Sequence, residues 1–357
     1  MLKNLPGIPA GFLLAPNTVY PARTVIYQKK LVYPKVRVKF ENPYQTHNAL
    51  ALLEAHGVVK RYASHTALSG INLSIPKGSI FGLLGPNGAG KTSFIRIINQ
   101  ITAPDEGQVL FDGQPLQPHH IERIGYLPEE RGLYKKMKVG EQLLYLARLK
   151  GLSASEATER LKRWAIKFDL QDWWGKNVED LSKGMQQKCQ FIATIVHEPE
   201  LIILDEPFSG FDPINANLLK DEILELKAKG STIIFSTHRM ESVEELCDHI
   251  ALINRSKVVL EGEKRAIKNQ FKDNSFTLEY SGAQPILPGG YEEISSTETE
   301  PGITRSHVRI GPGGSINGLI GSLLGQVELR SFQENIPSFN EIFIETVGKA
   351  NMPVSEV

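Results

Sequence analysis

The sequence predicts an α/β fold in which a mixed β-sheet is covered by helices. Two observations support this. From Leu53 onward, short apolar runs rich in β-branched residues alternate with amphipathic segments, and a long helical stretch separates two groups of these runs. The composition, 41% hydrophobic and 22% charged, is that of an ordinary globular protein. Forty acidic residues balance forty lysines and arginines, so net charge indicates no particular partner.

The chain of 357 residues is long for a single core, which favours one large domain with appendages or two domains. We expect a poorly ordered basic extension over 1–50, a main α/β domain over 51–265, and a small α+β accessory domain over 266–357. The first segment is rich in Pro, Tyr and basic residues and has no acid before Glu41. An inert extension, or a start placed too early, accounts for it better than a tail contacting lipid headgroups.

Short apolar runs predict the strands of the main domain. We expect strands at Ile80–Leu84, 109–111, 201–204, 232–235 and 250–253. The stretch 139–197 is instead mostly helical in pattern, with Leu143, Leu144, Leu146 and Leu149 expected along one face. This predicts a helical subdomain, at about 130–198, inserted between two halves of the sheet.

The accessory segment loses this pattern after Gly262. It offers strand-like 276–280, a Gly/Pro-rich middle, strand-like 307–310, a helical 316–324 and strand-like 327–332. No set of ligand-binding residues stands out in it. Two roles stay open for this segment. In one, it buries an edge of the main domain and aids dimerisation; in the other, it is regulatory.

The sequence predicts no membrane span. No run of about 18 uncharged apolar residues occurs, so we expect the chain not to cross a bilayer itself.

The two cysteines, Cys189 and Cys247, each lie in a helical pattern. This favours reduced, buried thiols over a disulfide framework or a zinc site.

A glycine-rich loop follows the strand Ile80–Leu84 and opens a helix. The segment Gly85-Pro-Asn-Gly-Ala-Gly90-Lys91-Thr92 fits the P-loop (Walker A) pattern. Glycines let backbone N–H groups turn inward around a β-phosphate, and the helix start adds its positive dipole end. Lys91 would neutralise phosphate oxygens, and the Thr92 hydroxyl would bind Mg²⁺. The residues expected to contact the nucleotide are Gly85, Pro86, Asn87, Gly88, Ala89, Gly90, Lys91, Thr92 and Ser93.

Two acids follow the apolar run 201–204. Asp205 and Glu206 would lie at the carboxyl end of this strand, where open α/β sheets bind ligands. We expect Asp205 to hold the Mg²⁺ shell. Glu206 would orient and deprotonate the attacking water as a general base.

The segment Leu181-Ser-Lys-Gly-Met-Gln186-Gln187, at the start of a helix, resembles the signature motif of ATP-binding cassette (ABC) proteins. Four further elements are similar to that family and occur in its order: Tyr62, 126–129, 209–212 and 236–238. The resemblance covers about 53–262 and implies a P-loop NTPase core of ABC type.

The resemblance implies roles for single residues within one chain. Tyr62 matches the aromatic residue that stacks on adenine, and His238 matches the residue that contacts the γ-phosphate of ATP. Glu129 stands where the family usually has Gln, a residue that reaches Mg²⁺ and the attacking water. A carboxylate can still bind Mg²⁺ but cannot donate an amide hydrogen bond.

Other roles imply a second chain. In the family, the residues matched by Ser182 and Gly184 contact the ATP held by another cassette, and the match of Asp212 helps to couple the two sites. The working unit would then be a head-to-tail dimer, expected to be a homodimer, with two ATP molecules at its interface. Lys183, where Gly is commoner, is electrostatically tolerable beside a phosphate.

A single cassette without a span resembles the separate ATPase subunits of transporters. The stretches 127–134 and 337–345 look most like bacterial export-type subunits, similar to sodium-efflux ATPases with a small C-terminal domain. We therefore expect an ATP-binding and hydrolysing subunit that powers a transmembrane permease subunit on a separate chain. It would be cytoplasmic and peripheral on the inner face of the plasma membrane.

A soluble ABC-type ATPase acting on nucleic acid or ribosomes is the alternative function. Chromosome-type members carry a long coiled-coil insertion between P-loop and signature, and translation-type members carry two cassettes with a charged linker. This chain has neither feature. No basic face with interleaved aromatic residues stands out, so we expect no nucleic-acid partner.

Overall fold

The computed structural model describes residues 50–63, 65–130 and 132–351. The expected N-terminal extension, 1–50, lies outside these residues apart from Leu50. None of the described helices combines the length and the apolar character needed to span a bilayer.

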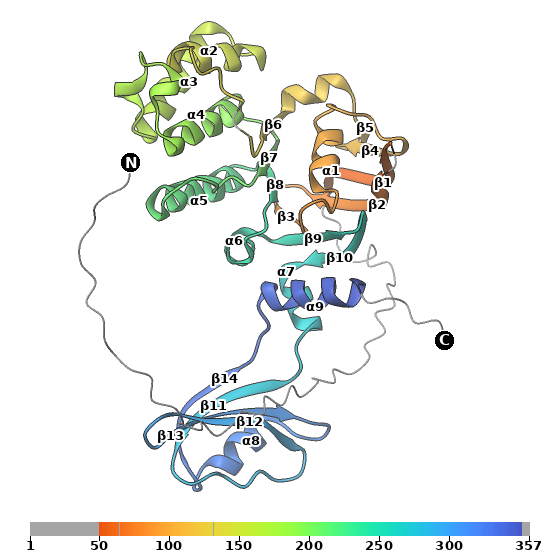
Figure 1. Cartoon of the computed structure of the whole chain (residues 1–357), viewed down its shortest axis with the longest axis vertical. Helices are drawn as coiled ribbons and strands as arrows, with labels where there is room; N and C mark the ends of the chain where they lie inside the picture. Colours follow the sequence, from red (N-terminus) through yellow and green to blue (C-terminus); the bar gives the residue numbers. More distant parts are fainter. Residues whose placement is uncertain (1–49, 64, 131, 352–357) are drawn as a thin grey trace, which may run out of the picture. The chain divides into compact units, whose positions relative to one another are not determined.

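The described residues form three β-sheets (Figure 1). A four-stranded antiparallel sheet has the order β2-β1-β4-β5, and a six-stranded sheet has the order β10-β9-β3-β8-β7-β6. The strands of the first are β1 (Ala51–Tyr62), β2 (His65–Pro76), β4 (Glu106–Phe111) and β5 (Gln114–Pro115). Those of the second are β3 (Ile80–Leu84), β6 (Ile124–Leu127), β7 (Leu201–Asp205), β8 (Thr232–Ser236), β9 (His249–Asn254) and β10 (Lys257–Glu263).

The six-stranded sheet is parallel except for β10 at one edge. Every residue of β3, β7 and β8 is buried, as expected for parallel strands that are covered on both faces. Because these strands run in the same direction, their carboxyl ends meet at one edge of the sheet. The P-loop follows β3 there, Asp205 ends β7, and Ser236 ends β8.

Alternate residues of these strands enter two different cores. Phe81, Ile203 and Ile234 pack with β1, β2 and helix α1 (Lys91–Ile98). On the other face, Ile202 and Phe235 pack with the helices that follow along the chain. These helices are α2 (Val139–Leu149), α3 (Ala154–Lys167), α4 (Lys183–Ile195), α5 (Pro213–Ala228), α6 (Met240–Leu246) and α7 (Lys264–Gln270), with short 3₁₀ turns at Pro118–Arg123, Gln171–Trp173 and Val178–Asp180.

The predicted helical stretch contains three helices, α2 to α4. Gly151, at φ +88°, follows the end of α2, and Asp169, at φ +55°, follows α3. The prediction that four leucines share one face of α2 is wrong, because Leu143 is buried and Leu149 is exposed. These residues are six positions apart, which places them on different sides of a helix with 3.6 residues per turn.

The accessory segment forms the third sheet, with the order β12-β13-β11-β14 and helix α8 on it. Phe276, Leu278 and Tyr280 of β11 pack against Leu319 and Leu323 of α8. The elements are β11 (Ser275–Ser281), β12 (Tyr291–Glu300), β13 (Ile303–Ile310), α8 (Ile316–Leu323), β14 (Glu328–Glu334) and α9 (Phe339–Asn351). Strand β12 lies in the stretch where only a Gly/Pro-rich middle was expected.

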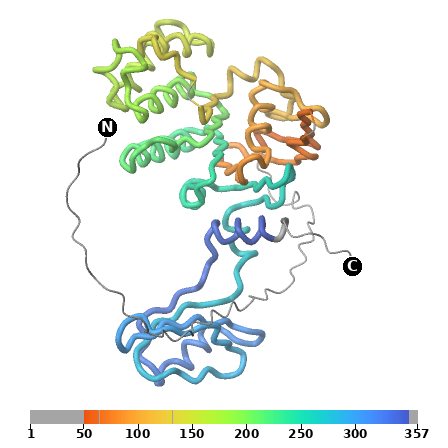
Figure 2. The backbone as a smooth tube through the Cα atoms, viewed as in Figure 1, coloured from red at the N-terminus to blue at the C-terminus, as the bar shows by residue number. Residues whose placement is uncertain are grey.

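Helix α9 does not pack on the accessory sheet. It contacts α6, β9 and β10 instead, and Phe339 and Ile342 join the large core of the main domain. Figure 2 follows the chain from β10 through the accessory sheet and back to α9.

Both cysteines are free and buried in the described structure. Burial raises the pKa of each thiol, Cys189 and Cys247, to about 12. They are therefore protonated, unreactive members of the core.

Candidate functional site

The P-loop needs glycine at Gly85 and Gly90. Both have positive φ, +148° and +119°, which L side chains rarely adopt. A Cβ on Gly85 would lie 2.2 Å from the carbonyl oxygen of Ile253, and a Cβ on Gly90 would lie 2.4 Å from that of Ala67. The loop is thus held close to β9 and β2 by backbone contacts that leave no room for a side chain.

Lys91 is buried within this loop. Its Nζ donates hydrogen bonds to the carbonyl oxygens of Gly85, at 2.7 Å, and Pro86, at 3.2 Å. Burial lowers the pKa of Lys91, while the charges of Asp205, Glu206 and Glu129 oppose this shift. The structure therefore places a buried cation within electrostatic reach of three carboxylates.

Asp205, at the end of β7, is the most buried acid of the site. Burial raises the pKa of Asp205, the neighbouring charges of Glu129 and Glu206 raise it further, and Lys91 opposes them. One lysine does not balance three acids, so a divalent cation would relieve the repulsion. The described residues hold no group of three His, Cys, Asp or Glu side chains arranged for a metal. Mg²⁺ fits such a site because it takes only one or two protein ligands and completes its shell with phosphates and water.

Glu206 is held in an unusual geometry. Its φ is +48°, a left-handed conformation that costs a non-glycine residue about 1–3 kcal/mol. The carboxylate accepts hydrogen bonds from the backbone N–H of His238, at 2.9 Å, and the hydroxyl of Thr237, at 3.1 Å. Nδ1 of the His238 ring lies 2.7 Å from the same carboxylate. Strand β8 and the residues after it thus fix the direction of the Glu206 carboxylate.

Tyr62 ends strand β1 and leaves part of its ring exposed. The ammonium group of Lys60 lies 5.5 Å from the ring centroid. The structure thus offers a partly accessible aromatic ring at this position, with one cation already beside it.

Ser182, Gly184 and Asp212 lie at the starts of two helices. Ser182 caps α4 by accepting from the N–H of Met185, and Asp212 caps α5 by accepting from that of Asn215. A Cβ added to Gly184 would approach no closer than 3.7 Å, to the ring of Phe211. Each cap contact is local to its own helix, Gly184 lies near Phe211 just before α5, and none of these contacts involves the P-loop.

The structure therefore brings together only some of the predicted site residues. Lys91, Asp205, Glu206, Glu129 and His238 form one cluster. The predicted signature residues contribute no side-chain contact to it in one chain.

Residues that were not predicted to be functional support the cluster. Thr237 donates a hydrogen bond to Glu206, and sequence reasoning could have found it because it lies inside the matched 236–238 stretch.

Two glutamines hold the backbone next to site residues. Gln187 donates to the carbonyl oxygen of Pro207, the residue after Glu206. Gln190 donates to the carbonyl oxygens of Pro128 and Glu130, on either side of Glu129. Gln190 lies outside every matched motif, so no sequence signal pointed to it.

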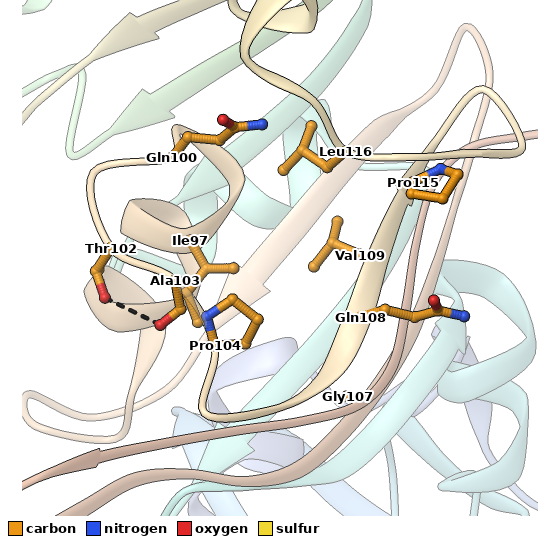
Figure 3. Close-up of a pocket in the computed structure, with 10 residues that line it drawn as sticks. All are labelled: Ile97, Gln100, Thr102, Ala103, Pro104, Gly107, Gln108, Val109, Pro115 and Leu116. Atoms are coloured by element: carbon orange, nitrogen blue, oxygen red, sulfur yellow. Dashed lines mark hydrogen bonds between the residues drawn. The ribbon is translucent and has the colours of Figure 1, made fainter.

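Figure 3 shows a separate pocket of about 340 Å³ that Ile97 helps to line. Ile97 is near the end of α1, the helix that Lys91 begins. Apolar side chains line much of it, including Ile97, Val109 and Leu116. None of its lining residues belongs to the P-loop, so the pocket is not the phosphate site.

Comparison with known families matches two parts of the chain. The model of the "ABC transporter" family matches residues 68–209, and that of the "ATP-binding protein DrrA1-3-like, C-terminal domain" matches residues 262–347. The second match includes most of α9 as well as the accessory sheet.

Several curated bacterial proteins are similar over long stretches. An uncharacterized ABC transporter ATP-binding protein of Bacillus subtilis, YhaQ, is 42% identical over 83% of this chain and 99% of its own length. The ABC transporter ATP-binding protein NatA of the same organism is 38% identical over 55% of this chain and 81% of its own. The Nod factor export ATP-binding protein I of Cupriavidus metallidurans is 33% identical over 60% of this chain and 71% of its own.

Solved structures agree with this assignment. A structure of the ATP-binding subunit of an ABC transporter has a TM-score of 0.58 and 31% identity, covering 62% of this chain and 93% of its own. A nucleotide-free ATP-binding cassette has a TM-score of 0.55 and 26% identity, covering 61% and 94%. These findings confirm the predicted fold class and favour a transporter subunit over the alternative that acts on nucleic acid or ribosomes. The chain belongs to the ATP-binding subunits of ABC transporters, the ATPases that hydrolyse ATP to drive transport.

Proposed function

We propose that ATP is hydrolysed at the Lys91, Asp205, Glu206 and His238 cluster. Lys91 and the P-loop bind the phosphates, and Thr92 and Asp205, with Glu129 nearby, hold Mg²⁺, which supplies charge neutralisation when bound. Glu206 orients and deprotonates the attacking water. The observation that supports this most is the Glu206 carboxylate, fixed by His238 and Thr237 beside the acids and the lysine. When ATP is bound, His238 would exchange its contact with Glu206 for one with the γ-phosphate.

We propose that the complete site needs two copies of the chain. Ser182 and Gly184 begin helix α4, whose N-terminal N–H groups favour an anion, and the contacts described for these two residues are with Met185 and Phe211 and not with the P-loop of the same chain. In a head-to-tail homodimer they would meet the ATP bound to the partner, with Asp212 beside the interface. Tyr62 would stack on the adenine ring.

The partner we propose is a transmembrane permease on a separate chain, with transport in the direction of export. Support comes from the relatives, whose names include an export ATP-binding protein and a lantibiotic transport ATP-binding protein of Streptococcus pyogenes. The protein would act at the cytoplasmic face of the plasma membrane. The proposed division into 51–265 and 266–357 assigns ATP hydrolysis to the first part.

The surface we propose for the permease is the exposed apolar side of α2 and the loop before it. Tyr134, Tyr145 and Leu149 are 58%, 44% and 62% exposed, and the two tyrosine rings meet edge to face at 6.5 Å. Large exposed apolar side chains gathered in this way are typical of interaction sites.

Replacing Tyr145 by Ala together with Leu149 by Ser is expected to reduce permease binding at least about tenfold. The reason is that both side chains are surface residues, so their loss removes contact area without disturbing the core. The measurement is recovery of a multispan membrane protein with the tagged chain from membranes solubilised in mild detergent. ATP binding by the isolated chain should be unchanged.

Ile166→Ser is the matched control, because Ile166 is 61% exposed on the neighbouring helix α3. It should leave recovery of the membrane protein unchanged. Equal recovery with both variants would contradict the proposed surface. Recovery of the wild-type chain only with ribosomes or DNA would contradict the permease partner itself.

Glu129→Gln is expected to retain ATPase activity, within about threefold of the wild-type kcat. The amide keeps an oxygen for Mg²⁺ and adds a donor, while the charge repulsion on Asp205 falls. Steady-state phosphate release at saturating ATP measures the effect. Complete loss of turnover would show that the negative charge of Glu129 is itself required.

A further inference from the structure

The last helix of the described residues, α9, packs on α6, the helix that follows His238. Phe339 and Ile342 of α9 are each 1% exposed and share a core with Val243 and Leu246 of α6. Helix α9 also contacts β9 and β10, which lie next to α6 along the chain. Because two large apolar side chains are buried in it, this contact stabilises the packing of α9 on the main domain.

Glu244 lies at the centre of this contact. Its carboxylate accepts the backbone N–H of Phe339 at 2.7 Å, the first residue of α9, and lies 3.0 Å from the ammonium group of Lys268. That ammonium group is also 5.4 Å from the centroid of the Phe339 ring. Lys264 donates to the backbone carbonyl oxygen of Glu244. We call these four residues, Glu244, Lys264, Lys268 and Phe339, the α6 clasp.

The carboxylate of Glu244 is ionised in this arrangement. Its partial burial alone would raise the pKa of Glu244, but the hydrogen bond from Phe339 and the charge of Lys268 outweigh burial and hold the pKa below its usual value. The clasp is therefore a charge-assisted cap on the first turn of α9 as well as a link to α7.

Helix α6 is separated from His238 by one residue, Arg239. The N–H of Arg239 donates to the hydroxyl of Thr237, and that hydroxyl donates to Glu206. A short helix of seven residues takes its position from what packs on it. Any shift of α6 against the sheet would therefore be carried directly to Thr237 and His238.

We propose that Glu244 is a positioning residue for ATP hydrolysis: through the α6 clasp it sets the place of α6 and hence of His238. The accessory segment is thereby linked to the site. It runs from α7, which carries Lys264 and Lys268, to α9, which begins at Phe339, and these three residues belong to the clasp. This inference rests on the proposed role of His238.

The test compares Glu244→Ala with Glu244→Gln in the full chain. The alanine variant loses both partners of the carboxylate, and we expect kcat to fall about fivefold or more, with KM for ATP within about twofold. KM is spared because the P-loop is untouched. The glutamine variant should recover much of kcat, because its amide oxygen still accepts the Phe339 N–H. Glu245→Ala is the matched control, since Glu245 is the next residue of α6 and pairs with Lys220 at the surface.

A combination with His238→Ala separates positioning from general stability. If Glu244 acts through His238, adding Glu244→Ala to His238→Ala should change single-turnover hydrolysis by less than about twofold. An equal loss in both backgrounds would overturn the inference, as would an unchanged kcat in Glu244→Ala while His238→Ala is impaired. An unimpaired His238→Ala protein would instead refute the proposed role of His238. Lys268→Ala gives a second variant of the clasp if Glu244→Ala fails to fold, with the same expected loss of kcat.

Discussion

Replacing Lys91 by alanine is expected to weaken ATP binding and to lower turnover about a hundredfold or more. The Lys91 ammonium group is the one cation of the described cluster, and it faces three acids whose charges it offsets. Without it, the phosphates would meet Asp205, Glu206 and Glu129 with no lysine to neutralise them. Equilibrium binding of a fluorescent ATP analogue and steady-state phosphate release measure the two effects.

Lys150→Ala is the control for lost folding. Lys150 is partly buried, its ammonium group also donates to two backbone carbonyl oxygens, and burial also lowers its pKa. It lies at the end of α2, outside the cluster. We expect its loss to affect thermal stability and leave kcat per folded molecule unchanged. Unchanged hydrolysis by Lys91→Ala would mean that the P-loop has been assigned wrongly.

Replacing Glu206 by glutamine is expected to preserve ATP binding and slow hydrolysis about a hundredfold or more. The amide oxygen can still accept from the N–H of His238, and the amide NH2 can donate to the hydroxyl of Thr237, so the geometry at the end of β8 is kept. The amide cannot take a proton from water. Bound ATP would then persist, and the protein should run as a dimer on a sizing column when ATP and Mg²⁺ are present.

The control for this dimer is Glu206→Gln combined with Lys91→Ala. It should remain monomeric with the same nucleotide, because dimerisation depends on bound ATP. A Glu206→Gln protein that stays monomeric at saturating ATP would contradict the two-copy mechanism.

Much of the fold was predictable because the central strands are short apolar runs with clear ends. The exposed strand β12 was missed because its residues, Tyr291–Glu300, are mostly polar and show no alternating apolar face. Strand β1 was not predicted in detail because register shifts, with Gly57 at φ +60°, interrupt its alternation. Sequence periodicity depends on one uninterrupted face, and neither strand has one.

The sequence predicts Lys91 and Asp205 as site residues because chemistry and spacing coincide there. The contacts that His238 and Thr237 make with Glu206 could not be predicted, because they depend on how two neighbouring strands end in space. The return of α9 to α6 was hidden for a similar reason. Phe339 and Val243 are far apart in sequence, and nothing in either local pattern shows that they share a core.

We propose that each ATP site combines the P-loop of one copy with the signature residues of another. Gly184→Asp tests this cleanly: the added side chain begins 3.7 Å from its nearest neighbour, so the single chain should fold, but a negative charge would face the partner's ATP. Alone, Gly184→Asp and Lys91→Ala should both be inactive.

Mixing the two inactive proteins is the most direct measurement. In a mixed dimer, the intact P-loop of the Gly184→Asp copy meets the intact signature of the Lys91→Ala copy, which restores one site of two. Because dimerisation depends on bound ATP, the productive dimers in an equimolar mixture are the mixed ones, and we predict ATPase activity of up to about half of the wild-type value. If the mixture stays inactive while wild-type copies hydrolyse ATP under the same conditions, each site is contained within one chain and the two-copy account is wrong.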